Sequence, residues 1–149
     1  MKVIIAGSRD LTDFGWVKPA VLASGFDIDQ VVSGGARGVD KLGERYSLEE
    51  LGKTATIMAA DWDRYGRKGP NHAGRVRNRQ MGDYSEGLLA LTLGTSGTTD
   101  MINYMRQLGK PVAVLDLSRP EVPVFIFPDG SSGPFFEIPV VKEWFWPCR

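Results

Sequence analysis

The chain has 149 residues, 42% of them hydrophobic, which suits one domain. Its 18 basic and 18 acidic side chains give a net charge of zero, which excludes a general electrostatic attraction to nucleic acid or to an anionic membrane. One cysteine and one histidine exclude an intramolecular disulfide and a Cys- or His-rich metal site, so no metal or other cofactor is expected. The apolar run after Met1 is too short for a signal peptide and no later run could span a bilayer, so we expect a cytoplasmic protein without a membrane partner.

Short apolar runs alternate with helical patterns over the first 117 residues. The runs predict five strands, at residues 2–6, 31–32, 55–59, 88–93 and 111–117. Between them, the periodicity predicts helices that begin near Lys18, span 39–51 and 75–84, and run from Gly97 to a stop at Gly109. Near-continuous apolar strands that alternate with amphipathic helices are typical of a parallel sheet covered on both faces. We therefore predict an α/β, Rossmann-like three-layer domain with a central parallel sheet over residues 1–117.

Ligands of such sheets bind in a crevice outside the carboxyl ends of the strands. Four segments are expected to meet there, and the first of them contributes Gly7, Ser8 and Arg9. The second segment, residues 33–38, is a glycine-rich turn between a strand and a helix. Glycines let the backbone approach a ligand, and the N–H groups of a first helical turn point at an anion.

This turn predicts a phosphate site, and the competing interpretation is a tight connection without a ligand. Its candidate binding residues are Ser33, Gly34, Gly35 and Arg37.

The third segment, residues 61–74, is polar, contains glycines and is long for a connection, which indicates a functional loop. Asp61 and Trp62 are its candidate binding residues. Between positions 64 and 79 the chain has six cations and no acid, a cluster that suits a small anion unless it is simply a solvated loop. Arg77 and Asn78, at the start of a predicted helix, are the strongest candidates in this cluster. Its cations are Arg64, Arg67, Lys68, Arg75, Arg77 and Arg79.

The fourth segment, residues 94–98, is a second turn at a helix N-terminus, with two glycines among hydroxyl side chains. Hydroxyls and N–H groups can together hold a phosphate or a ribose, whereas the alternative role of such hydroxyls is to cap the helix. We predict binding by all five residues: Gly94, Thr95, Ser96, Gly97 and Thr98.

The tail after Ser118 differs from the alternating pattern before it. Residues 124–127 and 135–138 are β-like and flank an Asp-Gly turn, which predicts a hairpin. The aromatic side chains of the tail either pack on the core or meet another subunit across a symmetric interface. We predict a subunit interface, and thus a homo-oligomer, for at least part of residues 118–149. The aromatic residues are Phe125, Phe127, Phe135, Phe136, Trp144, Phe145 and Trp146.

Several motifs, in order along residues 2–116, resemble those of the SLOG superfamily. Residues 33–40, Ser-Gly-Gly-Ala-Arg-Gly-Val-Asp, are similar to the S-G-x-A-R-G-[IV]-D signature of DNA-processing protein A. Residues 77–79, Arg-Asn-Arg, and 96–98, Ser-Gly-Thr, resemble that family's R-N-R and S-G-S/T. Residues 77–81 also resemble the R-K-x-x-M of the Lonely guy (LOG) nucleotide phosphoribohydrolases. The small YspA/YpsA-related branch is the most similar, because residues 7–9 and 61–66 match its G-S-R and D-W-x-x-x-G.

The resemblance implies a Rossmann-like fold that binds nucleotides or nucleotide-derived molecules. In the phosphoribohydrolases a loop glutamate works with an arginine on the N-glycosidic bond, and the position of that glutamate falls here on Met101. Methionine cannot stabilise an oxocarbenium-like centre or move a proton. Hydrolysis would therefore require Asp40, Glu44 or Asp61 to supply the carboxylate, with Arg77 as its partner.

Three hypotheses follow from these residues. The first is a binding module, a sensor or sequestering protein for a nucleotide or a cyclic nucleotide-derived signal. The second is a nucleoside 5′-monophosphate phosphoribohydrolase or other nucleotide N-glycosidase. The third is binding of single-stranded DNA, which the zero net charge disfavours. We predict the first, with a nucleotide-derived small molecule as the partner.

Overall fold

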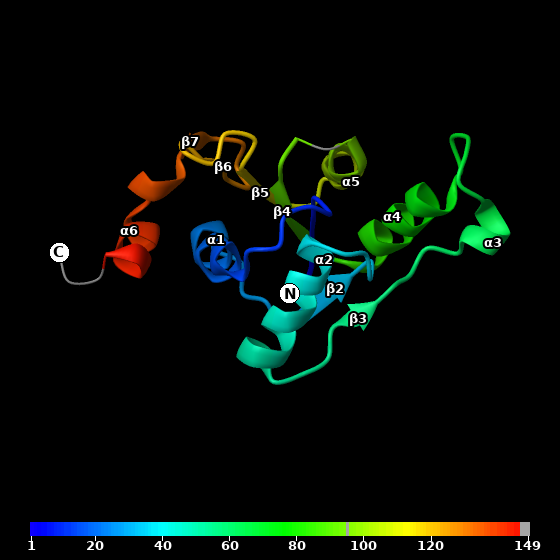
Figure 1. Ribbon diagram of the computed structural model, residues 1–149, viewed down its shortest axis with the longest axis horizontal. Helices are drawn as coiled ribbons and strands as arrows, with labels where there is room; N and C mark the ends of the chain where they lie inside the picture. Colours follow the sequence, from blue (N-terminus) through cyan, green and yellow to red (C-terminus); the bar gives the residue numbers. More distant parts are fainter. Residues whose placement is uncertain (95, 147–149) are drawn as a thin grey trace.

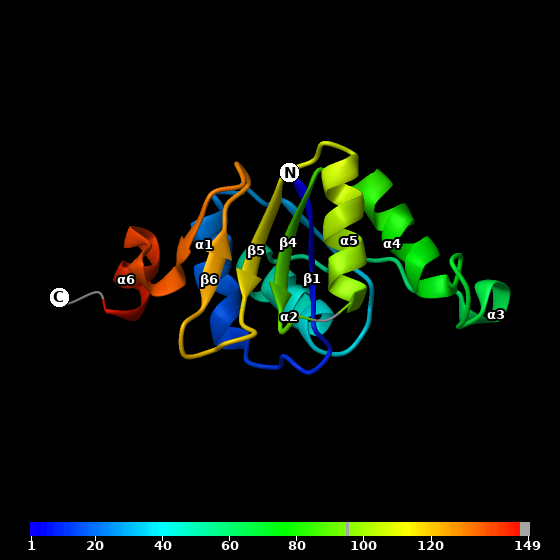
Figure 2. The ribbon, with the colours of Figure 1, turned by 90° about the horizontal axis from the view of Figure 1, so that it is seen from above.

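A computed structural model describes residues 1–94 and 96–146 of the chain. Its described strands form a seven-stranded sheet in the order β3-β2-β1-β4-β5-β6-β7 (Figures 1 and 2). Neighbouring strands from β3 to β5 are parallel, whereas β6 and β7 run antiparallel. The strands are β1 (Lys2–Gly7), β2 (Gln30–Ser33), β3 (Thr56–Ile57), β4 (Gly87–Thr92), β5 (Val112–Asp116), β6 (Val124–Ile126) and β7 (Ser132–Pro134).

Six α-helices connect and cover these strands within the described residues. Short 3-10 turns at Phe14–Trp16 and Phe135–Glu137 precede α1 and α6, and a π-helical turn at Ser47–Leu51 prolongs α2. The helices are α1 (Val17–Ser24), α2 (Val39–Tyr46), α3 (Trp62–Tyr65), α4 (Ala73–Tyr84), α5 (Ser96–Gln107) and α6 (Pro139–Phe145).

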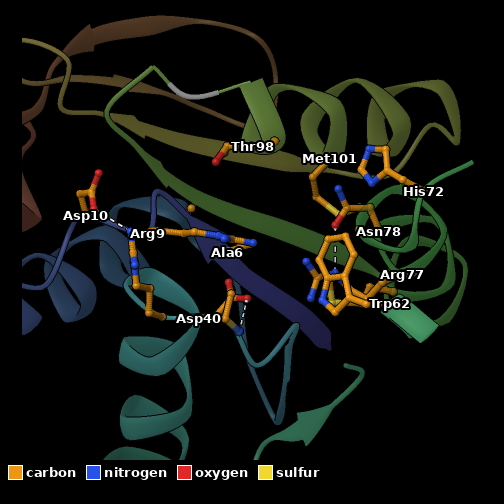
Figure 3. A pocket seen from close by; sticks show the side chains of 16 residues that line it. Ala6, Arg9, Asp10, Asp40, Trp62, His72, Arg77, Asn78, Thr98 and Met101 are labelled. Atoms are coloured by element: carbon orange, nitrogen blue, oxygen red, sulfur yellow. Dashed lines mark hydrogen bonds and ion pairs between the residues drawn. The ribbon is translucent and has the colours of Figure 1, made fainter. Parts of the chain in front are cut away.

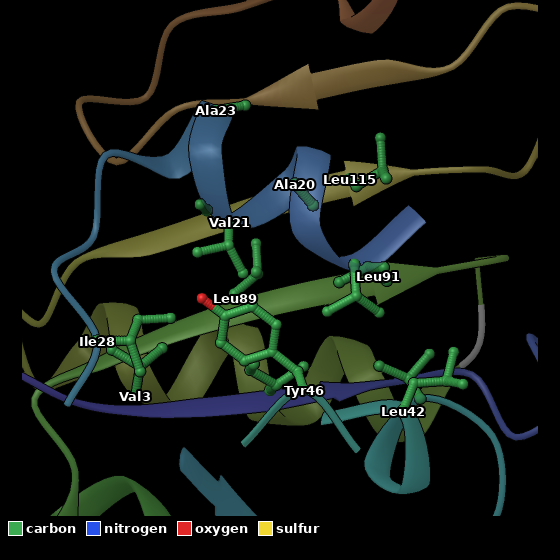
Figure 4. Close-up of a cluster of buried hydrophobic side chains, with 14 of the residues drawn as sticks. Val3, Ala20, Val21, Ala23, Ile28, Leu42, Tyr46, Leu89, Leu91 and Leu115 are labelled. Atoms are coloured by element: carbon green, nitrogen blue, oxygen red, sulfur yellow. The ribbon is translucent and has the colours of Figure 1, made fainter. Parts of the chain in front are cut away.

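Side chains that alternate along the strands build two separate cores, one on each face of the sheet. Val3 and Ile5 of β1 face the core that α1 and α2 cover, which Figure 4 shows in part. Ile4 and Ala6 of the same strand face the opposite core, to which α4 and α5 contribute methionines. Because both faces are covered, the parallel strands are apolar at nearly every position, as in other three-layer α/β folds. The predicted Rossmann-like three-layer architecture is thus confirmed.

The loop before α4 contains an element that the sequence did not predict. Residues 62–65 form the single-turn helix α3, and the Asp61 side chain caps it by accepting the Arg64 N–H at 3.1 Å. Helix α4 begins at Ala73 rather than at Arg75, because the Nδ1 atom of His72 accepts the Arg75 N–H and caps the helix two residues earlier than predicted. The third strand is shorter than predicted, with two residues instead of five.

The tail forms the predicted hairpin, but its second strand was placed wrongly. Residues 132–134 pair with β6, whereas residues 135–137 form a 3-10 turn. The tight turn at Asp129, whose carboxylate accepts the Ser131 N–H at 2.9 Å, brings Ser132 directly opposite Ile126 and so ends the pairing earlier. Phe125 and Phe135 are fully buried in the core beside α1. Packing on the core therefore accounts for this part of the aromatic tail.

The last described aromatics of the tail remain accessible. Trp144, Phe145 and Trp146 expose 44%, 37% and 46% of their surface, so the predicted subunit interface stays a prediction for these three residues. No described helix is long and apolar enough to cross a membrane.

Candidate functional site

A cleft of about 330 Å³ opens at the carboxyl ends of β1 and β4, and Figure 3 shows it from close by. Strands β2 and β4 flank β1 on its two sides, so the chain reverses its direction of progress across the sheet at this point. Open α/β sheets bind their ligands in the crevice at such a reversal. The loops after β1 and β2, the N-terminal turns of α4 and α5, and helix α3 all contribute lining residues.

Three arginines from three separate segments line this cleft. Arg9 follows β1, Arg37 follows β2 and Arg77 lies on α4. Arg37 forms an ion pair with Asp10 at 3.4 Å, but both side chains are at least three-quarters exposed, so the pair is weak and leaves Arg37 available. A small anion in the cleft would therefore meet guanidinium groups from more than one direction.

Arg77 is the arginine that the surrounding structure holds in place. Its Nη1 atom donates to the Gly34 carbonyl oxygen at 2.6 Å, and its Nε atom donates to Oδ1 of Asn78 at 3.3 Å. Burial lowers the pKa of Arg77, while the negative charge of Asp40 opposes that shift. An arginine keeps its charge under all ordinary conditions, so Arg77 presents a fixed positive charge to the cleft.

Asp40 is the buried carboxyl group of the cleft, only 6% exposed. Burial raises its pKa from 3.8 to about 6. Two interactions oppose this rise: the hydrogen bond that its Oδ2 atom accepts from the Ala36 N–H at 3.1 Å, and the positive charge of Arg77. Asp40 is thus a group that gains or loses a proton near neutral pH inside the cleft. Such a group is suited to proton transfer.

The first glycine-rich turn is largely packed against its own surroundings. The buried Ser33 hydroxyl donates to Oε2 of Glu44 at 2.7 Å and accepts the Gly35 N–H at 3.1 Å. Gly34 has no room for a side chain, since a Cβ atom there would collide with the Arg77 guanidinium and lie 2.8 Å from Oδ2 of Asp40. Gly38 has a φ of +78°, and a Cβ atom there would collide with the backbone carbonyl of Ser8. The turn therefore positions Arg77 and Asp40.

Two of the predicted ligand residues at the end of β1, Gly7 and Ser8, also have structural contacts. Ser8 is buried, and its hydroxyl accepts the Leu93 N–H at 2.8 Å, which ties the loop after β1 to the loop after β4. Gly7 lines the cleft, but a Cβ atom there would collide with the Leu91 carbonyl, so a glycine is required by strand packing alone. Gly34 and Gly35 line a neighbouring hollow of about 350 Å³, which shares the three arginines with the cleft.

The second turn is more open than the first. Gly97 and Thr98 line the cleft, and a Cβ atom at Gly97 would have no described atom within 4 Å. Gly94 lies outside the cleft lining, with a φ of +93° and its N–H bonded to Oγ1 of Thr92 at 2.8 Å. Of the other predicted residues, Thr95 lies outside the described residues, and Ser96 is described only as the first residue of α5.

An aromatic pair forms the wall of the cleft on the side of α3 and α4. The rings of Trp62 and His72 are parallel within 3°, with their centroids 6.4 Å apart, and both line the cleft. Arg67 lies over the Trp62 ring at 4.8 Å. Sequence reasoning found Trp62 but missed His72 and Gly74, because a lone histidine and a helical glycine carry no distinctive pattern. Asp61, which was predicted to bind, is exposed, caps α3 and lies outside the lining.

The predicted cluster of six cations is spread over several surfaces. Arg77 is the member of the cluster that lines the cleft. Arg75 pairs with Asp100 at 3.4 Å, Arg64 lies over Tyr65, and Arg79 lies over Tyr104. The positive charge of the cleft therefore comes from Arg77 together with Arg9 and Arg37, which the cluster does not include.

One of the three candidate catalytic carboxylates lies in the cleft, namely Asp40. Glu44 points instead to Ser33 and to Lys41, whose Nζ atom is 3.4 Å away. Met101, on which the resemblance placed the glutamate position, is 2% exposed and lines the cleft. No group of three or more His, Cys, Asp or Glu side chains that could hold a metal ion occurs in the described part of the chain.

Comparisons of the chain with models of protein families, with curated proteins and with solved structures found no match.

Proposed function

We propose that the cleft binds a nucleotide or a nucleotide-derived anion, including a cyclic one, and that the protein acts as a sensor or sequestering protein for it. The observation that carries the proposal is the convergence of Arg9, Arg37 and Arg77, from three segments, at the reversal point of a parallel sheet. Guanidinium groups bind phosphate through parallel charge-assisted hydrogen bonds. The N-terminus of α5 at Gly97 lines the same cleft and adds backbone N–H groups.

The size of the cleft supports a small ligand. A volume of about 330 Å³ lies at the lower end of the roughly 300–1,000 Å³ range of small-molecule sites. The net charge of zero gives little support to binding of a long nucleic acid, which depends on many phosphate contacts.

Hydrolysis of the N-glycosidic bond is the second candidate function, and Asp40 favours it. Its pKa of about 6 and its place beside Arg77 would let it exchange a proton with a bound nucleotide. Met101 argues against this function, because the thioether that lines the cleft can neither accept a proton nor stabilise a developing positive charge. Binding without turnover is therefore the function that the site supports best.

Titration calorimetry with the common nucleoside 5′-monophosphates, at low and high salt, tests the proposal. Binding of at least one of them, weakened by salt, is the expected result, and no binding of any would contradict it. Chromatography of the same mixtures after long incubation separates the two functions, since release of free base would establish the N-glycosidase. Tight binding of oligonucleotides with a steep salt dependence would favour the third hypothesis, single-stranded DNA.

We also propose that the chain forms a homo-oligomer through the accessible end of the tail. Trp144 and Phe145 lie on α6 with more than a third of their surface exposed. The double variant Trp144→Ser, Phe145→Ser should lower the mass measured by light scattering to that of a single chain. If the wild type is larger than one chain and the double variant has the same mass, the interface lies elsewhere.

A further inference from the structure

We propose that Trp62 and His72 flank the planar base of the bound nucleotide. This inference rests on the proposed function and names the part of the ligand that these two rings receive. Figure 3 shows Arg9 and Thr98 reaching into the cleft from one side, whereas Trp62 and His72 lie on the other, with Arg77 beside Trp62. The two rings present the flat faces on which bases stack, and the neighbouring arginines suit the phosphate.

The geometry of the two rings carries the argument. They are parallel within 3°, but their centroids are 6.4 Å apart, much farther than two rings in full face-to-face contact, which lie about 3.5 Å apart. The rings are therefore parallel without being in full face-to-face contact. A parallel pair of this kind leaves aromatic surface available for a third flat ring.

Gly74 keeps the space between the two rings empty. A Cβ atom at this position would lie 3.2 Å from Cε1 of His72 and 3.5 Å from Cη2 of Trp62, so one added atom would touch both rings at once. Gly74 lies in the first turn of α4, where its backbone needs no positive φ, and alanine is the better helix former there. Neither backbone conformation nor helix stability requires glycine here, whereas an open space between the rings does.

The simpler role of the pair is to hold α3 against α4. His72 caps α4, and Trp62 is the first residue of α3, so their contact joins the two helices. This role and base stacking predict different responses to ligands. A joining contact would affect every ligand of the cleft alike, whereas a stacking site would affect only ligands that have a base.

The test compares nucleoside 5′-monophosphates with ribose 5-phosphate, which lacks the base, by titration calorimetry. In Trp62→Leu and in Gly74→Ala we expect the nucleoside monophosphates that bind the wild type to lose about tenfold in affinity, while ribose 5-phosphate keeps its affinity within twofold. Trp62→Phe retains a flat ring and should stay within threefold of the wild type. Trp144→Leu is the matched control, because α6 lies at the opposite end of the molecule from α3 (Figures 1 and 2), and it should change neither affinity.

Two other outcomes overturn the inference, and a third contradicts the proposed function on which it rests. If Trp62→Leu and Gly74→Ala bind nucleoside monophosphates as the wild type does, the base lies elsewhere while the proposed function stands. If both variants lose the two kinds of probe equally, Trp62 and His72 only join the helices. If Trp62→Leu fails to fold by circular dichroism, Gly74→Ala decides alone. A wild-type protein that binds neither kind of probe contradicts the proposed function itself.

Discussion

The two glycine-rich turns of the cleft look alike in the sequence and differ in the structure. In the first turn, the space beside Gly34 is filled by Arg77 and Asp40, and the space beside Gly38 by the backbone of the loop after β1. In the second turn, a Cβ atom at Gly97 would meet no described atom within 4 Å. The first turn therefore holds the charged groups of the cleft in position, and the second leaves room for a ligand. A glycine-rich turn between a strand and a helix can serve either purpose, and the neighbours of each glycine decide which.

The largest effect that separates the two turns is expected for Gly38→Ala. Its φ of +78° and ψ of −131° are strained for any residue with a Cβ atom, and that atom would collide with the Ser8 carbonyl. We expect a loss of about 2–4 kcal/mol in the free energy of unfolding, measured by urea titration. A loss below about 0.5 kcal/mol would show that the first turn is not packed as the structure describes.

The second prediction concerns the group that the first turn holds. Removing the guanidinium in Arg77→Ala should weaken binding of nucleoside monophosphates by about 10- to 100-fold, because a charge-assisted contact to phosphate is lost. Arg77→Lys should rescue this only in part, since an ammonium group cannot form two parallel hydrogen bonds. Calorimetry measures both variants.

Arg79→Ala provides the matched control for Arg77→Ala. Arg79 lies on the same helix, but its guanidinium packs over Tyr104 at 5.4 Å, outside the cleft lining. Its loss should leave the affinity within about twofold. Equal losses in the two variants would mean that the general positive charge of α4, rather than the position of Arg77, attracts the ligand.

The architecture was predictable from the sequence because strand and helix patterns are local. Apolar runs such as Leu88–Leu91 and the helical spacing of Met101 and Met105 depend only on which face is buried. The hairpin of the tail was predictable for the same reason, from the turn at Asp129. Its second strand was misplaced, because the length of pairing depends on the geometry of the turn and not on the β-like composition of Phe135 and its neighbours.

The cleft was predictable only in part, because its membership depends on contacts between distant segments. Gly97, Arg77 and Trp62 were found from motifs, whereas His72 and Gly74 line the cleft beside the Trp62 ring, which lies ten residues before the one and twelve before the other. Ser33 was a candidate as part of the first turn and Glu44 as a substitute carboxylate, yet they bond to each other and neither lines the cleft. No local pattern distinguishes a hydroxyl that holds a turn from one that holds a ligand.

The third prediction concerns how the stability of the protein depends on pH through Asp40, which the first turn holds in position. Because the pKa of Asp40 is raised to about 6 in the folded protein, the folded state binds a proton more tightly than the unfolded state does. The contribution of Asp40 to the free energy of unfolding should therefore fall as the pH rises from about 4 to about 6, and then stay low. Asp40→Asn should remove this dependence, and should be more stable than the wild type above pH 6 by about 2 kcal/mol.

Urea titrations of both proteins at pH 4, 5, 6 and 7 measure this difference. Other carboxyl groups titrate in the same range, so the informative quantity is the difference between wild type and variant at each pH. A difference that stays constant from pH 4 to 7 would refute the raised pKa of Asp40.

The smallest effect on stability is expected at the open turn. A methyl group in Gly97→Ala meets no described atom within 4 Å, and alanine favours a helix, so the free energy of unfolding should stay the same or rise by up to about 1 kcal/mol. The same methyl group occupies space next to the cleft, where a ligand would approach the N-terminus of α5. We therefore expect the affinity for nucleoside monophosphates to fall by about threefold in calorimetry, a modest loss because one methyl group displaces the anion only slightly. A protein that loses stability but not affinity would show that the second turn, like the first, serves to hold the fold together.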